Sequence, residues 1–276
     1  MSDPGAILIT GCSSGIGRAT AEHLVDKGHT VYATARRIES IADLERRGCR
    51  TLALDVLDES SMAAAVGAVE DAHGSVGALV NNAGYAVSGA IEAVSVDQLR
   101  DQFETNVFGS VRLAQLVLPG MRRARRGRIV NISSVAGRVT MPGAGAYAAS
   151  KYAVEAISDA LRFEVRGFGV RVIVIEPGPI RTEFTGTANQ ALAEGDGGPY
   201  SEYHAAVAKG DAETDESFIA GKPEHVASAI ERALTAPRPK ARYRVTPIAR
   251  ILPVLRGTLG DRAFDAFLRT QVKPPS

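Results

Sequence analysis

The sequence predicts an α/β fold in which helices cover both faces of one doubly wound parallel sheet. Three observations support this prediction. Short apolar runs alternate with helical patterns, a glycine-rich turn follows the first apolar run, and polar or glycine residues follow the later ones. Alternating strands and helices are typical of parallel sheets, which bind ligands at the carboxyl ends of their strands. The length suits one such domain, so we expect a single unit over residues 1–276.

The composition is that of an ordinary soluble globular protein, with 45% hydrophobic and 23% charged residues and a net charge of +1. This balance indicates neither nucleic-acid nor anionic membrane binding. The arginine cluster at 122–128 follows a helical pattern that ends near Met121, and cations are favourable at a helix C-terminus. Because no aromatic residues are interleaved with these arginines, we expect no nucleic-acid partner.

The number and spacing of cysteines and histidines bear on the redox compartment of the protein and on metal binding. Two cysteines, Cys12 and Cys49, and no signal peptide predict a reducing, cytoplasmic location without disulfides. The scattered histidines and cysteines have no metal-ligand spacing, so no metal is expected. No apolar run approaches the roughly 18 residues that would span a bilayer.

The first strand and the turn after it predict a nucleotide-binding loop. Residues 6–10 form an apolar run, and residues 11–17 follow with the spacing G-x-x-x-G-x-G before a helix that ends near Gly28. Glycines let the backbone approach a pyrophosphate, and a helix N-terminus offers free N–H groups to phosphates. A purely structural glycine turn is the alternative, which the strand–turn–helix context disfavours. The expected contacts are Gly11, Ser13, Ser14, Gly15, Ile16 and Gly17.

The end of the second strand, at residues 30–35, predicts the cofactor. In a dinucleotide site an acidic residue at this point binds the 2′-hydroxyl of NAD, whereas an arginine accommodates the 2′-phosphate of NADP. Arg36 and Arg37 follow the strand, and no acid occurs before Glu39. Because a guanidinium can grip a phosphate with two hydrogen bonds, we predict NADP(H) in preference to NAD(H). Arg36 would be the main contact and Arg37 its support, and two solvated loop arginines are the alternative.

The other elements follow from the same patterns. Short apolar runs bounded by turn residues predict strands at 50–54, 78–80, 127–132, 171–176 and 243–246. Apolar positions three or four residues apart predict helices at 38–47, 59–73, 96–121, 147–165 and 223–234. Asn106 lies inside the longest helix, where asparagine has poor propensity and usually points to solvent or caps a kink. Residues 135–146 are expected to form a glycine-bearing loop.

Tyr147 and Lys151 form a candidate acid/base pair. Four residues apart on a helix, they share one face and can meet. An ammonium beside a phenol favours the phenolate and lowers its pKa from the usual value near ~10. Such a pair could donate a proton to an oxygen at neutral pH, or remove one. The spacing alone occurs by chance in many long proteins, so the interpretation depends on the rest of the chain.

Six motifs occur in order, and together they identify a family. They are Thr10-Gly11-x-x-x-Gly15-Ile16-Gly17, Asn81-Asn82-Ala83-Gly84, Asn106, Ser134, Tyr147-x-x-x-Lys151 and Pro177-Gly178-x-x-x-Thr182. In this combination the chain resembles the short-chain dehydrogenase/reductase family in its single-domain, Rossmann-type form, over about residues 5–185. The Ala-Arg-Arg sequence after the second strand and the basic, apolar C-terminal tail resemble the hydroxysteroid-dehydrogenase-like branch of that family.

The resemblance implies roles for individual residues. Tyr147 is then the general acid in reduction and the general base in oxidation, and Lys151 lowers its pKa and binds the nicotinamide ribose. Ser134, rather than Ser133, hydrogen-bonds the substrate oxygen, and Asn106 holds a water that links Lys151 to solvent. The remaining implied cofactor contacts are Asp55 and Val56 beside adenine, Asn82, Ala83 and Gly84 along the cofactor, and Pro177, Gly178, Ile180 and Thr182 at the carboxamide.

Substrate selection is expected in the C-terminal third. Residues 183–222 lie where the family has a substrate lid, and we expect partial helices there that order on ligand binding. Val135 and Phe184 are candidate substrate contacts, and Tyr200 and Tyr203 could line the same pocket. The apolar extension at 248–276 predicts one or two amphipathic helices, interrupted by Pro253 and Gly257. It could cover the substrate cleft, a subunit interface or a membrane surface.

These observations favour an NADP(H)-dependent oxidoreductase that acts on a carbonyl or secondary alcohol, with a hydrophobic, steroid-like or lipid-like substrate. One alternative is a cofactor-sensing protein on the same fold, which would lack a member of the Ser/Tyr/Lys set that is complete here. Another is an epimerase or dehydratase, which usually needs a larger substrate domain and a different glycine spacing. The resemblance also implies a homodimer or homotetramer formed through helices 96–121 and 147–165.

Overall fold

The computed structural model describes residues 3–182, 198–217 and 219–275, and it contains a seven-stranded sheet in which every neighbouring pair is parallel. The strand order is β3-β2-β1-β4-β5-β6-β7. The strands are β1 (Ile7–Ile9), β2 (Val31–Ala35), β3 (Arg50–Ala53), β4 (Ala78–Asn81), β5 (Gly127–Ile132), β6 (Val170–Glu176) and β7 (Arg242–Arg244). The predicted doubly wound parallel sheet is therefore confirmed. The order reverses between β1 and β4, and ligands bind α/β sheets at such a switch point.

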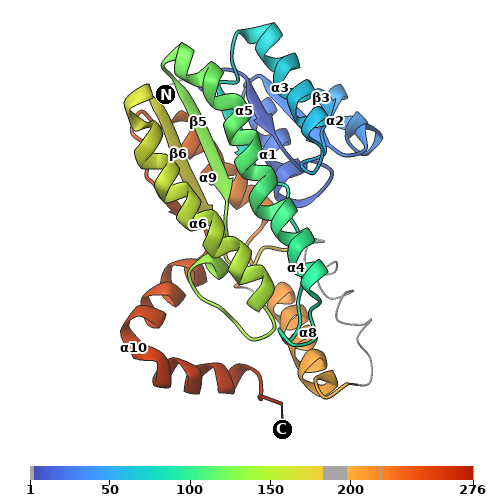
Figure 1. The fold of residues 1–276 in the computed structure, drawn as a ribbon, viewed down its shortest axis with the longest axis vertical. Coiled ribbons are helices and arrows are strands. Elements are labelled where there is room, and N and C mark those ends of the chain that lie inside the picture. The colour runs from blue at the N-terminus through green and yellow to red at the C-terminus, as the bar shows by residue number, and fades with distance from the viewer. Residues whose placement is uncertain (1–2, 183–197, 218, 276) are drawn as a thin grey trace.

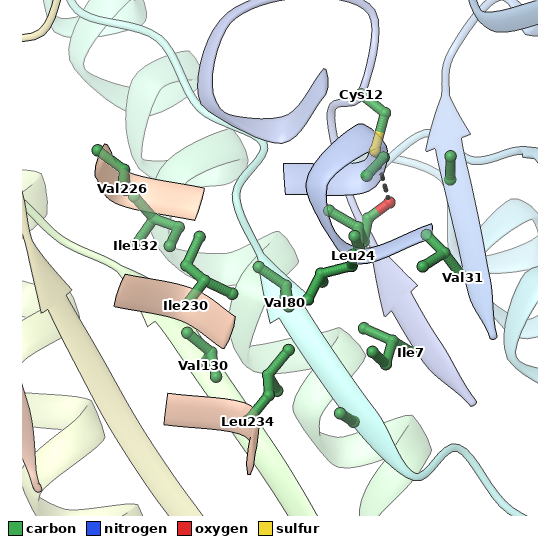
Figure 2. Close-up of a cluster of buried hydrophobic side chains, with 14 of the residues drawn as sticks. Ile7, Cys12, Leu24, Val31, Val80, Val130, Ile132, Val226, Ile230 and Leu234 are labelled. Carbon is green, nitrogen blue, oxygen red and sulfur yellow. Dashed lines mark hydrogen bonds between the residues drawn. The ribbon is translucent and has the colours of Figure 1, made fainter. Parts of the chain in front are cut away.

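Helices cover both faces of the sheet, as Figure 1 shows. Side chains on one strand alternate between the faces, so Ile7 and Ile9 belong to one buried cluster and Leu8 to the other. The first cluster lies beneath α1 (Gly15–Asp26) and α9 (Pro223–Thr235), and Figure 2 shows Leu24 of α1 and Ile230 of α9 in it. The second lies beneath α3 (Glu59–His73), α5 (Gly109–Ala124) and α6 (Gly145–Val165).

The predicted helix over 96–121 is divided into three segments. It consists of α4 (Val96–Phe103), the π-helical turn η2 (Glu104–Phe108) and α5. Asn106 lies in the π-helical turn, and its amide hydrogen-bonds the backbone of Tyr85 in a neighbouring loop. A single uninterrupted helix was therefore the wrong prediction. Because π-helical turns accommodate an extra residue and occur frequently at functional sites, this interruption marks Asn106 as a residue of interest.

Three 3₁₀ turns and the short helix α2 complete the part of the fold that precedes β6. The helix predicted at 38–47 is a 3₁₀ turn η1 (Ile38–Ile41) followed by α2 (Ala42–Arg46). A second 3₁₀ turn, η3 (Val135–Gly137), lies in the predicted loop before α6. A third, η4 (Arg166–Phe168), follows α6. The helix α6, which carries Tyr147 and Lys151, begins at Gly145, two residues earlier than predicted.

The C-terminal elements α8 (Ser201–Glu216) and α10 (Pro247–Gln271) lie together beyond one end of the sheet (Figure 1). α10 consists of two helices that meet at Gly260, whose backbone φ of 68° favours glycine. We expected interruptions at Pro253 and Gly257, but both residues lie within the first helix. Leu252 and Phe264 of α10 pack against Val139. The extension therefore covers the loop that follows Ser134.

Candidate active site

The glycine turn after β1 is closely packed against the turn after β4. Gly11 and Gly15 have φ values of 70° and 55°, which favour glycine. A Cβ atom on Gly17 would lie 2.2 Å from the carbonyl oxygen of Gly11 and 2.4 Å from Nδ2 of Asn82. The helix α1 therefore approaches its own loop so closely that only glycine fits at position 17.

Asn82 and Thr10 hold this loop in place. Asn82 Nδ2 donates hydrogen bonds to the carbonyl oxygens of Thr10 (2.9 Å) and Gly11 (3.1 Å). The Thr10 hydroxyl oxygen accepts hydrogen bonds from the backbone N–H groups of Asn82 (3.0 Å) and Ala83 (2.9 Å). The side chain of Asn82, which the resemblance places beside the cofactor, thus supports the backbone of the glycine turn.

Cys12 is a structural member of this turn. Its side chain is buried, and Sγ donates to the carbonyl oxygen of Ile9 (3.4 Å), as Figure 2 shows. Burial raises the pKa of the Cys12 thiol to about 12. Because the thiolate is the reactive form of cysteine, this thiol is unsuited to act as a nucleophile.

The phosphate side of the predicted cofactor site has the features that a dinucleotide requires. The N-cap of α1 is Ser14, whose side chain makes no capping hydrogen bond, so it does not occupy the N–H groups of the first turn. Arg36 and Arg37 are exposed just after β2, and their side chains have no hydrogen-bond or ion-pair partner among the described residues. A backbone cradle at a helix N-terminus and two available guanidinium groups fit a phosphorylated dinucleotide.

Two further strand ends complete this surface. Asp55 Oδ1 accepts a hydrogen bond from the N–H of Leu57 (3.0 Å), which fixes the turn after β3. Val56 is buried, and a Cβ atom on Gly109 of α5 would lie 2.7 Å from its carbonyl oxygen. After β6, Thr182 Cγ2 lies 3.4 Å from the place that a Cβ on Gly15 would occupy. The structure therefore brings the predicted contacts of the first and last motifs to one place.

The neighbouring residues of the last motif are fixed by the C-terminal segment. Ile180 is buried and forms an isolated parallel bridge with Gly221. A Cβ atom on Gly178 would lie 2.2 Å from Oγ1 of Thr246, the N-cap of α10. The segment 177–182 is thus held between the glycine turn and the start of α10.

Ser134, Tyr147 and Lys151 meet at the carboxyl end of β5. Ser134 is the N-cap of η3, and its hydroxyl hydrogen-bonds Tyr147. Lys151 Nζ lies 5.6 Å from the centre of the Tyr147 ring and donates a hydrogen bond to the carbonyl oxygen of Ile132 (2.9 Å). Lys151 is only 6% exposed. The predicted catalytic serine, tyrosine and lysine therefore form one constellation.

Burial dominates the protonation equilibria of this constellation. It raises the pKa of Tyr147 to about 12, and the hydrogen bond with Ser134 acts in the opposite direction. It lowers the pKa of Lys151 to about 8, and the charge of Glu155 opposes that shift. The spacing of the pair predicted a lowered tyrosine pKa, so that direction is wrong for the protein alone. The sequence shows that the two residues share a helix face, but it does not show that both are desolvated.

Asn106 is buried beside Lys151 rather than pointing to solvent. Its Oδ1 accepts from the N–H of Tyr85 (3.0 Å), and its Nδ2 donates to the Tyr85 carbonyl (2.8 Å) and to Ser150 Oγ (3.0 Å). A Cβ on Gly84 would lie 2.8 Å from Asn106 Oδ1 and 3.7 Å from Lys151 Nζ. The second, third and fifth motifs of the sequence thus meet at one site, through Gly84, Asn106 and Lys151.

Ser150 is a site residue that we did not predict. Its hydroxyl accepts from Asn106 Nδ2 and donates to the carbonyl oxygen of Tyr147 (2.7 Å). The Ser150 hydroxyl therefore links the π-helical turn to the first turn of α6. Its position between Tyr147 and Lys151 in the sequence was the available signal.

A cavity of about 740 Å³ opens beside this site. Its walls are the segment 89–92, residues 140–145, Tyr152 of α6, α8, and α10 from Arg256 onward with the residues that follow it. It reaches Gly145, two residues before Tyr147, but neither Tyr147 nor Ser134 lines it. Tyr200 and Tyr203 line the cavity as predicted. Phe184 lies outside the described residues, and Val135 packs with the cluster beneath α10.

Comparison with known proteins identifies the family. Residues 5–193 match the family described as short chain dehydrogenase. The chain belongs to the short-chain dehydrogenase/reductase family. It is 39% identical to the NADPH-dependent 3-dehydrocapnine reductase of Ornithobacterium rhinotracheale, over 96% of each chain. Identity is 36% to the 3-ketodihydrosphingosine reductase of Bacteroides thetaiotaomicron, over 90% of each chain. It is also 36% to human 17-beta-hydroxysteroid dehydrogenase type 1, over 92% of this chain and 81% of that protein.

Solved structures of this family have the same fold. A short-chain dehydrogenase from Streptomyces avermitilis superposes with a TM-score of 0.80, at 34% identity over 96% of each chain. A serine dehydrogenase in complex with NADP⁺ superposes with a TM-score of 0.76, at 30% identity over 88% of this chain and 95% of that chain. This short-chain dehydrogenase is therefore an oxidoreductase with a Rossmann-type sheet.

Two further observations bear on partners of this short-chain dehydrogenase. Across residues 3–182, 198–217 and 219–275, no helix combines the length and the apolar character needed to cross a membrane. In the same part of the chain, no group of three or more histidine, cysteine, aspartate and glutamate side chains is placed to hold a metal ion.

Proposed function

We propose that this enzyme uses NADP(H), in preference to NAD(H), to interconvert a ketone and a secondary alcohol on a hydrophobic, lipid-like or steroid-like molecule. The observation that carries the proposal is the meeting of Ser134, Tyr147 and Lys151 at the carboxyl end of β5. Relatives named as reductases of 3-dehydrocapnine and 3-ketodihydrosphingosine, and as a hydroxysteroid dehydrogenase, support the same class of reaction.

The residues suit proton transfer to a single substrate oxygen. In reduction, the Tyr147 hydroxyl would donate its proton to the oxygen of the carbonyl, while Ser134 donates a hydrogen bond to it. When bound, the reduced nicotinamide supplies the hydride that the carbonyl carbon accepts. Well-placed donors to a developing alkoxide are worth about 3 kcal/mol in comparable sites. In oxidation the same groups would act in reverse, with Tyr147 as the base.

Lys151 and Asn106 would serve the proton of Tyr147. The buried ammonium of Lys151 lies near the ring of Tyr147 and favours the phenolate when the proton leaves. Asn106 Oδ1 and Lys151 Nζ lie 2.8 Å and 3.7 Å from the place that a Cβ on Gly84 would occupy, so Asn106 lies near the ammonium. We propose that protons reach Lys151 from the direction of Asn106, through a water that Asn106 holds, as the family resemblance implies.

The preference for NADP(H) rests on Arg36 and Arg37. Both side chains are exposed at the end of β2 and lack partners among the described residues. No carboxylate stands at this strand end to bind a ribose 2′-hydroxyl, and guanidinium groups are suited to a 2′-phosphate. The names of one relative and one solved structure include NADPH and NADP⁺.

The substrate proposal rests on the cavity. Its volume lies in the range of typical small-molecule sites. Apolar side chains from three elements form much of its wall, namely Ile91, Met141, Phe264, Leu268 and Val272. An extended apolar substrate could occupy this space while its carbonyl approaches Tyr147. Residues 183–197, which include Phe184, belong to the predicted lid and lie outside the described residues.

The oligomeric state and the cellular location are also proposals. Phe108 and Phe163 are 52% and 86% exposed on the surfaces of η2 and α6, in the helices that the resemblance assigns to subunit contacts. We propose a homodimer or homotetramer formed through these helices, in a cytoplasmic location. Ile251, Val254 and Leu259 of α10 are also exposed, so binding to a membrane surface is an alternative use of this helix. Sedimentation of the full chain with liposomes would test it.

The proposed function is tested by measuring NADPH oxidation with a panel of ketones and aldehydes. The panel should contain ketones of increasing apolar length with the same reacting group, together with short polar ketones as controls. We expect kcat/KM to rise with apolar length and to be higher with NADPH than with NADH. Tight NADPH binding without oxidation by any member would instead support a cofactor-sensing protein. Conversion of a sugar nucleotide without net NADPH oxidation would support an epimerase or dehydratase.

A further inference from the structure

A buried carboxylate lies one helical turn after the catalytic lysine. Glu155 follows Lys151 by four residues on α6, so the two side chains share a face of the helix. Glu155 is 5% exposed and Lys151 is 6% exposed. A buried acid of this kind is costly unless it is paired. Its partners therefore indicate what it does.

Arg242 fixes Glu155 from the neighbouring strand. Both Nε and Nη2 of Arg242 lie 2.9 Å from Glu155 Oε2. The same guanidinium lies 3.1 Å from Oε1 of the buried Glu176 and 2.6 Å from Asp159 Oδ1. Arg244 completes the group, with Nε 2.9 Å from Glu176 Oε2. This network joins α6 to β6 and β7.

Glu155 packs against the backbone that carries Ser134 and Lys151. A Cβ atom on Gly137 would lie 3.0 Å from both Glu155 Cγ and the carbonyl oxygen of Lys151, and 2.7 Å from Ser133 Oγ. Ser133 directly precedes Ser134, and Glu176 directly precedes the Pro177-Gly178 turn. Glu155 therefore lies at the junction between the serine strand, the lysine and the turn predicted to contact the cofactor.

We propose that Glu155 is a positioning residue for the Lys151 ammonium: its carboxylate, held by Arg242 one helical turn from Lys151, keeps the buried lysine protonated at neutral pH. The hydrogen bond from Lys151 Nζ to the Ile132 carbonyl is a bond to a neutral acceptor. A nearby carboxylate supplies the compensating charge that a neutral acceptor lacks. The catalytic consequence of this inference rests on the proposed function, whereas the charge state of Lys151 does not.

The electrostatics of the site agree with this assignment. Burial lowers the pKa of Lys151 to about 8, and Glu155 is the charge that opposes the decrease. Burial and Glu176 raise the pKa of Glu155, whereas Ser133 and Arg242 favour its charged form. The titratable and charged groups around Lys151 and Glu155 are Tyr147 and Asp159 of α6, Glu176 of β6, and Arg242 and Arg244 of β7.

The direct test is the titration of Lys151 by NMR in the full-length protein, with carbon-13 at the lysine ε position. The chain has only six lysines, and Lys151→Arg assigns the signal. We expect Glu155→Gln to lower the pKa of Lys151 by about one unit or more, as for removal of a close opposite charge. Glu155→Asp should restore part of this shift. The matched control is Asp159→Asn, which also removes a partner of Arg242 but lies two turns from Lys151, and it should leave the pKa unchanged.

Two outcomes would overturn the inference. One is an unchanged Lys151 titration in a folded Glu155→Gln variant, even if its Tm falls, because Glu155 would then be structural only. The other concerns the wild-type protein, which decides the matter if the variant does not fold. Its Lys151 signal should show a second inflection where the Glu155 carboxyl titrates, and absence of that inflection would refute the coupling.

The kinetic consequence is measured separately. If the enzyme reduces ketones as proposed, the alkaline limb of its kcat profile should move to lower pH in Glu155→Gln by the same shift, because the neutral lysine then forms earlier. NADPH affinity measured at a pH below both limbs should change little. If the wild-type protein turns over no ketone, the proposed function fails, but the lysine titration still decides the role of Glu155.

Discussion

The contrast between Gly17→Ala and Gly67→Ala tests the packing of the cofactor turn. Both glycines lie in helices, so the two substitutions add the same methyl group to the same backbone conformation. On Gly17 the new Cβ would lie 2.2 Å from the Gly11 carbonyl oxygen and 2.4 Å from Asn82 Nδ2. On Gly67 of α3 it would meet nothing within 4 Å. The two variants therefore differ only in what surrounds the methyl group.

The magnitudes follow from these contacts. Relief of the clash at Gly17 requires α1 to move away from the Gly11 carbonyl oxygen and Asn82 to lose its hydrogen bonds to Thr10 and Gly11. Overpacking costs about 1–3 kcal/mol, and each lost hydrogen bond costs about 1 kcal/mol. The gain in helix propensity, about 1 kcal/mol, offsets part of this. We expect a net loss of about 2–4 kcal/mol for Gly17→Ala and a gain of about 0.5–1 kcal/mol for Gly67→Ala.

Thermal unfolding and cofactor titration measure both effects. At roughly 2 °C per kcal/mol for a chain of this size, Gly17→Ala should lower Tm by about 4–8 °C, and Gly67→Ala should raise it by about 1–2 °C. Gly17→Ala should also weaken NADPH binding, because the phosphate-binding backbone is displaced, whereas Gly67→Ala should bind normally. Equal Tm and equal NADPH affinity in the two variants would refute the close approach of α1 to its loop.

Two further predictions concern the ends of the cofactor site. Arg36→Asp should shift the ratio of kcat/KM for NADPH and NADH toward NADH, because a carboxylate repels a 2′-phosphate and can accept from a 2′-hydroxyl; an unchanged ratio would exclude Arg36 as the phosphate contact. Asn106→Ala should lower the stability by about 2–4 kcal/mol, since it leaves the partly buried N–H and carbonyl of Tyr85 without their side-chain partner and removes the bond to Ser150. It should also lower kcat, and a variant with wild-type Tm and kcat would contradict the role of the π-helical turn.

The sheet could be predicted from the sequence because its signal is local. Each strand is a short apolar run, and the alternation with helical patterns determines parallel pairing. Strand positions agree with the structure within a few residues at every strand. The glycine turn could also be predicted from the sequence, because the backbone conformations of Gly11 and Gly15 and the crowding at Gly17 require glycine at these positions.

Features that depend on tertiary contacts could not be predicted from the sequence in the same way. The π-helical turn at Asn106 is satisfied by the backbone of Tyr85, 21 residues away. The direction of the Tyr147 pKa depends on burial by several elements, and the spacing to Lys151 conveys only one of the causes. The break in α10 falls at Gly260, whose φ of 68° favours glycine, and not at Pro253, which lies inside the first helix.

The cavity shows the same limitation. Tyr200 and Tyr203 were predicted to line a pocket, but their docking depends on residues far away in the sequence. The Tyr200 hydroxyl donates to Glu92 (2.6 Å), and the Tyr203 hydroxyl oxygen accepts from the N–H of Gly143 (2.6 Å). The walls from α10 could not be placed from periodicity, because an amphipathic helix shows which face is apolar but not what that face covers.

The central claim, that Tyr147 is the acid/base of an NADP(H)-dependent reaction, is tested most directly by Tyr147→Phe. The variant removes one hydroxyl and leaves the glycine turn unchanged. With the best ketone of the panel we predict that kcat falls by roughly 10²–10⁴-fold, while NADPH binding stays at the wild-type affinity. Tyr243→Phe, on β7, is the matched control and should retain its turnover. Wild-type turnover in Tyr147→Phe would contradict the account.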